Sequence, residues 1–280
     1  MLKVSQLFIY PVKSLAGIAI NKALVTDRGF EYDRRWMLVD KYNLFISQRV
    51  VPEMALLKAE ITDHGIKIDY QLKNSAYIIP FQPETNEFAD VAIWDDTCRG
   101  QFVSNEADTW FSKMLDFPCR LVYMPDETTR TTDPRYTPEK SITSFSDAYP
   151  FLIIGQSSLD DLNSRLDEQL PMNRFRPNIV FTGGMPFEED LMNTFTIGDI
   201  TFHGVKLCAR CIMTTINQDT AVKNKEPLKT LARYRFKNNK TLFGQNLVHE
   251  GSGEIAICDE IKVLKLNNED RFVVNALQNS

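Results

Sequence analysis

Two cysteines separated by two residues, Cys208 and Cys211, mark the segment whose residue types are best suited to chemistry. Apolar residues alternate in the run before them, and a β-favouring run at 212–216 follows, so we expect the pair on a turn between two strands. Arg210 lies between the two thiols. A neighbouring cation stabilises a thiolate, which is the form of cysteine that acts as a nucleophile or a metal ligand. The segment therefore indicates thiolate chemistry but does not by itself name the reaction.

Three other interpretations of the cysteine pair compete with this one. A free cysteine is most often a small buried hydrophobe, so packing is the commonest role for either thiol. A structural zinc site usually needs four soft ligands, and the other cysteines stand singly, as Cys98, Cys119 and Cys258. A thioredoxin-like redox pair opens a helix, whereas a β-favouring run follows this pair. The sequence favours neither the zinc site nor the redox pair.

Strands are the main elements that must position this segment. In the first 123 residues, β-favouring runs bounded by turn residues predict strands at 4–10, 18–26, 36–40, 54–61, 66–70, 76–79, 91–94 and 119–123, typical of an antiparallel barrel or sandwich. One helix is expected at 105–115, with Asn105 as its N-cap. Residues 124–149 are rich in threonine and contain almost no aliphatic side chains, which predicts a long loop at a domain junction.

The second half of the chain is also predicted to be mostly β. Its strands are expected at 151–154, 178–181, 195–197, 200–205, 241–248, 254–257 and 261–265. Helices are expected from 157, with Ser158 as a cap, and at 227–236. The predicted fold class is therefore mainly β with a few α-helices, an α+β fold, in two domains at 1–122 and 123–280.

The composition restricts the classes of function. The chain has 280 residues, of which 43% are hydrophobic and 25% charged, as in a globular protein able to bury a core. A net charge of −5 argues against a general nucleic-acid binder. Five cysteines without the spacing of a disulfide framework fit a reducing compartment. No stretch approaches the roughly 20 apolar residues of a membrane span, and the chain starts directly at a predicted strand, so we expect a cytoplasmic protein without nucleic-acid or membrane partners.

A set of short motifs runs in order along almost the whole chain. They are YPVKS at 10–14, DRRW at 33–36, SD at 146–147, PFLI at 150–153, NSRL at 163–166, FRPNI at 175–179, RCIMTT at 210–215, DT at 219–220, KEPL at 225–228 and FGQN at 243–246. In this order and spacing the chain resembles the MOSC-domain molybdenum enzymes, in particular the mitochondrial amidoxime-reducing component and the bacterial YcbX-type proteins. The resemblance implies an N-terminal MOSC_N β-barrel-like domain followed by a C-terminal MOSC β-barrel domain.

The resemblance also implies a cofactor, the molybdenum cofactor (Mo-molybdopterin), whose dithiolene sulfurs bind the metal and whose pterin carries a phosphate. The family's metal-ligating cysteine matches Cys211, and thiolate is a soft donor. Phosphate favours lysine and arginine, which form charge-assisted hydrogen bonds with it. The positions that match cofactor contacts in the family are Lys13, Ser14, Arg34, Asp147, Ala148, Arg176, Ala209, Arg210 and Asn246.

The activity that the resemblance implies is reduction of N-hydroxylated compounds, such as amidoximes, hydroxylamines or N-hydroxylated bases. Cys211 would be catalytic as the metal ligand, and Asp219 is a candidate proton donor. The chain has no Cys-x4-Cys-x2-Cys spacing of a plant-type iron–sulfur cluster, so electrons are expected from a separate protein of the ferredoxin, flavoprotein reductase or cytochrome type. Two alternatives stay open: a carrier of molybdenum cofactor or of a persulfide on Cys211, and a divergent member that binds another anion.

Two departures from the family pattern fall near the expected site. After Thr215 many relatives continue Val-Asp-Pro-Asp-Thr-Gly, whereas this chain has Ile-Asn-Gln-Asp-Thr-Ala at 216–221. The position that is threonine in the animal enzymes is Ala148, which removes one hydroxyl. We expect these changes to affect turn geometry and substrate fit more than metal binding.

Overall fold

Strands dominate the computed structural model, which describes residues 1–137 and 141–267. The strands are β1 (Leu2–Ile9), β2 (Ile18–Ile20), β3 (Lys22–Thr26), β4 (Gly29–Phe30), β5 (Trp36–Val39), β6 (Lys58–Thr62), β7 (Gly65–Tyr70), β8 (Ser75–Ile79), β9 (Phe88–Ile93), β10 (Asp96–Phe102), β11 (Arg120–Tyr123), β12 (Phe151–Gly155), β13 (Ile179–Thr182), β14 (Met192–Ile197), β15 (Ile200–Ala209), β16 (Phe236–Lys237), β17 (Lys240–Glu250), β18 (Gly253–Ala256) and β19 (Glu260–Leu266). The predicted mainly β fold class is confirmed.

Helices are few and short. The α-helices are α1 (Asn105–Leu115), α2 (Gln156–Asn163) and α3 (Leu228–Leu231), and the 3₁₀ helices are η1 (Pro52–Leu56), η2 (Gln71–Lys73), η3 (Met172–Arg174), η4 (Glu188–Asp190) and η5 (Ile212–Thr215). Within the described residues, none of these helices has the length and apolar character needed to cross a lipid bilayer.

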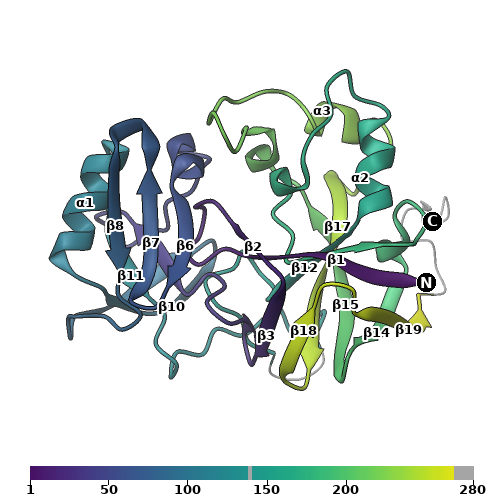
Figure 1. Cartoon of the computed structure of the whole chain (residues 1–280), viewed down its shortest axis with the longest axis horizontal. Coiled ribbons are helices and arrows are strands. Elements are labelled where there is room, and N and C mark those ends of the chain that lie inside the picture. Colours follow the sequence, from purple (N-terminus) through teal and green to yellow (C-terminus); the bar gives the residue numbers. More distant parts are fainter. Residues whose placement is uncertain (138–140, 268–280) are drawn as a thin grey trace, which may run out of the picture.

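Seven strands of the largest sheet close into a barrel (Figure 1). Their order is β12, β13, β1, β19, β14, β15 and β17, and β17 pairs back onto β12. Side chains alternate between the two faces of a strand, so one set from each strand fills the barrel interior. Phe151, Phe195 and Phe202 belong to this core and are almost fully buried. Leu159 of α2 and Leu231 of α3 pack in a second apolar cluster with residues of β12, β13 and β17.

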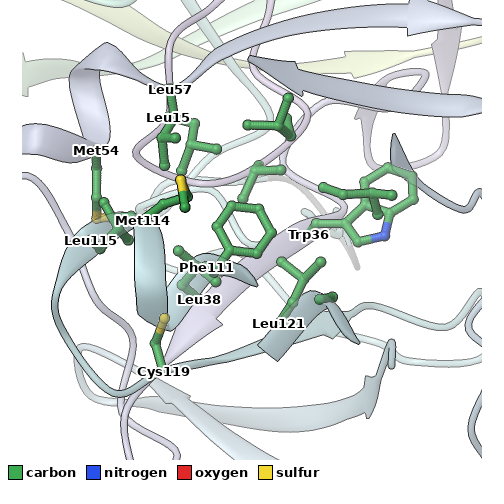
Figure 2. Packing of buried hydrophobic residues seen from close by; sticks show 14 of the residues in the cluster. Leu15, Trp36, Leu38, Met54, Leu57, Phe111, Met114, Leu115, Cys119 and Leu121 are labelled. Carbon is green, nitrogen blue, oxygen red and sulfur yellow. The ribbon is translucent and has the colours of Figure 1, made fainter. Parts of the chain in front are cut away.

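Two smaller sheets and α1 form the other part of the molecule. One sheet has the order β5-β11-β10-β9 and the other the order β6-β7-β8. Figure 2 shows Phe111 of α1 packed among Trp36, Leu38 and Leu121 of the four-stranded sheet. An amphipathic helix laid on a sheet in this way buries its apolar face and leaves its polar face in water.

The first strand of the chain belongs to the barrel and not to the part that follows it in sequence. β1 lies between β13 and β19, with Lys3 opposite Thr182 and Leu2 opposite Ile261. The chain then leaves the barrel, builds the smaller sheets and returns at β12 (Figure 1). The predicted domain boundary at residue 122 divides the sequence, but the barrel contains strands from both sides of that boundary.

Several predicted elements differ from those observed. Residues 54–56 lie in η1, which begins at Pro52, a residue favoured at the first position of a helix, and 212–215 form η5. The N-cap of α1 is Ser104, not Asn105: its Oγ accepts from the amide of Ala107 at 3.1 Å.

The second half and one edge strand hold the remaining corrections. Ser158 does not cap α2, because it lies inside the helix, whose N-cap is Gly155; its hydroxyl instead donates to Glu189 at 2.8 Å. The helix expected at 227–236 is only four residues long, since Phe236 pairs with Thr241 in a β-hairpin. β10 was not predicted, because its sequence is largely polar and lacks β-branched residues other than one threonine.

Candidate functional site

Cys211 lies where barrel strand β15 ends and η5 begins. It is the N-cap of η5, in an extended conformation, two residues after Ala209 ends the strand. The hydroxyls of Thr214 and Thr215 donate to the carbonyls of Cys211 and Ile212, three residues back, at 3.0 and 2.7 Å. Such local bonds offer the backbone an alternative to a sheet ladder, which explains why this β-favouring run is helical.

A buried arginine fixes η5 to the rest of the barrel. Arg174 is 4% exposed, and its Nε and Nη2 donate to the carbonyls of Thr214 and Thr215 at 3.0 and 3.1 Å. The backbone that carries Cys211 is therefore held by a side chain that the sequence did not single out.

The hydrogen-bond donor to the half-buried Cys211 thiol comes from the other half of the chain. Arg49 Nη2 donates to Cys211 Sγ at 3.1 Å. The Arg49 guanidinium lies 4.4 Å from the ring centre of Trp94, and its Nη2 is 3.8 Å from Asp147 Oδ2. A cation beside a cysteine sulfur is typical of sites where the sulfur acts as a metal ligand or a nucleophile. Arg49 was not predicted, although the polar run 47–49 between apolar residues is a signal that could have found it.

Lys13 is buried beside the same aspartate. Its side chain is 5% exposed, and its Nζ donates to Asp147 Oδ1 at 2.7 Å and to the carbonyl of Phe145 at 2.8 Å. Burial lowers the pKa of Lys13 to about 8, and the charge of Asp147 opposes that shift. Asp147 therefore joins Lys13 to Arg49 and, through Arg49, to Cys211.

Two further cations stack on one buried tyrosine. The guanidiniums of Arg34 and Arg176 lie 4.5 and 4.2 Å from the ring centre of Tyr10. Arg34 pairs with Asp33, and Arg176 donates to the carbonyl of Leu15 at 2.7 Å. Burial raises the pKa of Tyr10 to about 12 and lowers that of Arg176 to about 10. Tyr10 thus stays neutral and offers both cations the face of its ring.

Three of the predicted cofactor residues have a left-handed backbone. The φ angle is +69° at Ser14, +53° at Arg34 and +56° at Arg176. This conformation costs free energy for residues with a Cβ, and residues held in it cluster at active sites and ligand clamps. Arg176 is a buried cation, Arg34 is a partly buried one, and Ser14 directly follows the buried Lys13.

Arg210 and Cys208 form a second contact between an arginine and a thiol. Arg210 Nη1 donates to Cys208 Sγ at 2.9 Å, and Nη2 donates to the carbonyl of Phe175 at 2.6 Å. Cys208 also packs against the apolar cluster that contains Phe175 and Phe243. The two thiols of the Cys-x-x-Cys pair are therefore held by different arginines and in different surroundings.

The other predicted residues lie at the margin of this group. Ala148 and Ala209 are exposed, each next in sequence to a member of it. Asn246 of β17 donates from Nδ2 to a backbone carbonyl of β15 at 3.2 Å. Asp219 is exposed and accepts a hydrogen bond from Lys58 at 3.1 Å. Among the described residues, Asn246 and Asp219 are thus bonded to their own neighbours and not to Cys211.

A buried pair of glutamines connects the two halves of the molecule beside the site. Gln48 and Gln218 exchange amide hydrogen bonds of 3.1 and 2.9 Å and are 0% and 5% exposed. Gln48 also donates to the carbonyl of Ser14 at 2.7 Å, and Lys223 donates to that of Arg49 at 3.2 Å. The site is thus built at a joint between two packed units, a frequent location for ligand sites.

Among the described residues, this group contains more cations than the carboxylates they contact. The cations are Lys13, Arg34, Arg49, Arg176 and Arg210, and the carboxylates are Asp33 and Asp147. Arg49 Nη1 and Arg210 Nε are buried without a hydrogen-bond partner. A buried unpaired donor costs free energy until a ligand or water satisfies it. A soft sulfur donor beside unsatisfied donors fits a ligand that carries both a metal and an anionic group.

Comparisons with known proteins match both halves of the chain. The model of the MOSC N-terminal beta barrel domain matches residues 1–118, and that of the MOSC domain matches residues 140–262. Mitochondrial amidoxime-reducing component 1 of Mus musculus is 30% identical over 93% of this chain and 82% of its own length, and the Homo sapiens protein is 31% identical over the same shares. The molybdenum cofactor sulfurase of Oryza sativa subsp. japonica is 31% identical over 87% of this chain but only 32% of its own length.

Proposed function

The chain belongs to the family of proteins that join a MOSC N-terminal β-barrel domain to a MOSC domain, and from this membership we propose that it is a molybdenum-cofactor-dependent reductase of N-hydroxylated compounds. Relatives named as amidoxime-reducing components support this substrate class, which covers amidoximes, hydroxylamines and N-hydroxylated bases. The observation that carries the proposal is the half-buried Cys211 thiol, hydrogen-bonded by Arg49 and connected through Asp147 to the buried Lys13.

In this proposal the Cys211 sulfur binds the metal of the cofactor, and the cationic side chains bind its phosphate. Cys211 supplies the soft sulfur ligand to the metal, and Arg49 orients that sulfur through its hydrogen bond. The phosphate is bound by buried cations, because charge-assisted hydrogen bonds to phosphate oxygens are strong. The residues proposed for the phosphate and the pterin are Lys13, Ser14, Arg34, Asp147, Ala148, Arg176, Ala209, Arg210 and Asn246.

When bound, the cofactor would supply the metal and the two-electron chemistry that breaks the N–O bond. The overall reduction of an amidoxime takes up two electrons and two protons and releases an amidine and water. The protein orients the substrate and holds the charges around it. Asp219, exposed on the loop that follows η5, is proposed to pass protons from solvent, a role in which bulk water can partly replace it.

The electrons are proposed to come from a separate protein of the ferredoxin, flavoprotein reductase or cytochrome type. Five free cysteines fit a reducing compartment, and we propose the cytoplasm. Since several relatives carry names of mitochondrial components, fractionation of cells that express the protein tests this placement.

A second candidate function rests on the sulfurase relative, of which this chain covers one part. The same residues would then hold molybdenum cofactor, or a persulfide on Cys211, for delivery to another enzyme. Transfer of the cofactor to an apo-enzyme without any reductase turnover would favour this carrier over the reductase.

The test of the reductase is the metal content and turnover of protein made in a host that synthesises the cofactor. Wild-type protein should contain close to one molybdenum per chain and reduce an N-hydroxylated base with a competent electron donor. Cys211→Ala should lose activity by about a thousandfold or more, as when a catalytic group is deleted. Cys208→Ala is the matched control and should retain most activity. Molybdenum-loaded wild type that turns over no N-hydroxylated substrate with any competent donor would refute the reductase.

A further inference from the structure

Trp94 is a large aromatic residue held in an unusual conformation at the turn between β9 and β10. Its φ angle is +56°, a left-handed conformation that is rare for a bulky residue. Trp94 is 51% exposed, so burial of the ring does not explain this strained backbone conformation. Strain of this kind persists where the surroundings fix the residue, and it is frequent at ligand-binding sites.

Three contacts fix the Trp94 ring. The guanidinium of Arg49 lies 4.4 Å from the ring centre, and the Phe45 ring packs against it in a T-shaped arrangement with 4.9 Å between the two ring centres. The indole nitrogen donates to Asp147 Oδ1 at 3.4 Å. The ring is therefore oriented on the site side by two members of the charged group described above.

The same arginine places Trp94 beside the reactive sulfur. Arg49 touches the indole ring and also donates to Cys211 Sγ at 3.1 Å. Two apolar side chains next to these residues stay exposed, Val50 at 68% and Ile212 at 50%. An exposed aromatic ring, a planar cation and an apolar margin thus border the thiol, and the first two come from the half of the chain that does not carry Cys211.

We propose that Trp94 and Arg49 form the platform on which the flat, conjugated part of an N-hydroxylated substrate packs. Aromatic amidoximes and N-hydroxylated bases are planar, and planar rings stack on tryptophan and on guanidinium groups. The N–O group of such a substrate is polar and would point toward the charged side of the platform. This inference rests on the proposed reductase function. It adds that the enzyme prefers aryl and heteroaryl N-hydroxylated compounds to alkyl ones.

The experiment compares wild-type holoenzyme with Trp94→Ala and Trp94→Phe on benzamidoxime and acetamidoxime, which differ in the aromatic ring. In Trp94→Ala, the KM for benzamidoxime should rise roughly tenfold, as expected for loss of one stacking partner, with kcat nearly unchanged. The KM for acetamidoxime should stay the same. Trp94→Phe should restore most of the lost affinity, since it keeps an aromatic face.

Phe88→Ala is a matched control. Phe88 is 40% exposed and carries Arg99 at 4.7 Å from its ring centre, so it repeats the arginine–aromatic pair. It lies at the other end of β9, roughly 20 Å away by the rise of a strand, and its loss should leave both KM values unchanged.

Three other results would overturn the platform. Loss of molybdenum in Trp94→Ala would assign the ring to the cofactor, and a raised KM for the electron donor alone would assign it to protein docking. Equal changes for both amidoximes, or none, would also refute it. If wild-type enzyme reduces neither of these compounds nor any other N-hydroxylated substrate, the reductase proposal fails. Calorimetric binding of the two amidoximes to wild type and Trp94→Ala then still decides the platform, which stands only if wild type binds benzamidoxime more tightly and the variant loses that difference.

Discussion

Two clusters of buried and partly buried charge in this molecule are balanced differently. Beside the barrel, Arg235 pairs with Asp190 of η4, and both side chains are less than 8% exposed. At the joint between the two halves, the carboxylates that pair with the cations Lys13, Arg34, Arg49, Arg176 and Arg210 are, among the described residues, Asp33 and Asp147. One cluster is matched within the protein, and the other has an excess of positive charge.

The difference separates a structural role from a binding role. A buried ion pair is self-contained, and removing one partner leaves the other as an uncompensated charge. Cations in excess of carboxylates are instead available to an anion, and the protein meets part of their cost with carbonyl groups and aromatic faces such as Tyr10. The comparison therefore predicts that substitutions in the two clusters change different properties.

The largest expected effect is on stability in the matched cluster. Arg235→Gln should lower the free energy of unfolding by about 3–5 kcal/mol, because it removes the cation of a buried ion pair. Arg176→Gln in the other cluster should change it by no more than about 1 kcal/mol, since it loses one hydrogen bond but also removes a buried charge. Urea unfolding of cofactor-free protein measures both.

The same pair of variants should show the opposite order in cofactor retention. Arg176→Gln should weaken retention about 10- to 100-fold, the value of a charge-assisted hydrogen bond, while folded Arg235→Gln should retain molybdenum normally. Equal loss of stability in both variants, with equal retention, would show that the two clusters do not differ in role.

A smaller effect is expected from the carboxyl next to the matched pair. Burial, and then the charge of Asp190, raises the pKa of Glu189 from 4.5 to about 8. The folded state therefore holds a proton that the unfolded state releases above pH 4.5, so wild-type stability falls between about pH 4.5 and 8. Glu189→Gln removes the titrating group, so its free energy of unfolding should not fall over this pH range. At pH 7 the variant should be more stable than wild type by about 1–3 kcal/mol, and below pH 4.5 it should not be more stable.

Thermal unfolding of Glu189→Gln across pH 4 to 8 checks this, with Glu188→Gln as the control one residue away. The control should show no gain that grows with pH. A pH-independent difference between wild type and Glu189→Gln would mean that Glu189 stays ionised in the fold, and the matched cluster would then contain an extra charge.

The smallest effect is expected at the solvent edge of the unmatched cluster. Asp219 is exposed and paired with Lys58, and such pairs contribute about 0–1 kcal/mol. Asp219→Asn should lower kcat by about two- to fivefold, because water can deliver protons in its place. A fall of 100-fold or more would make Asp219 the essential acid of the reaction and extend the site beyond the charged group.

Much of the architecture could be predicted from local patterns. Alternating apolar residues mark most strands, and the ordered motifs bring together Lys13, Arg34, Arg176 and Cys211 from four distant segments. The errors occur where side chains override propensity. Residues 212–215 are helical because two threonine hydroxyls bond backward to the chain, which no count of β-favouring residues includes.

Residues that act across the joint could not be predicted. Arg49 and Gln48 bond to partners more than 160 positions away, and periodicity carries no information about contacts of that separation. Trp94 was expected to end a strand, whereas it occupies the turn after β9 with a positive φ. The sequence patterns thus predicted the strands and singled out Cys211, but they did not predict the side chains, such as Arg49 and Gln48, that the N-terminal half contributes beside it.

The position of β1 in the barrel affects how the protein can be synthesised and dissected. During translation, β1 emerges from the ribosome well before its neighbours in the barrel. β13 and β19 follow only after most of the chain has emerged. The barrel therefore cannot seal during translation until its last strand is complete. A fragment that starts at residue 123 would lack β1, so the edges of β13 and β19 would be left unpaired. Exposed strand edges favour aggregation. A synthetic peptide of residues 1–10, added in trans, should restore the solubility of the fragment.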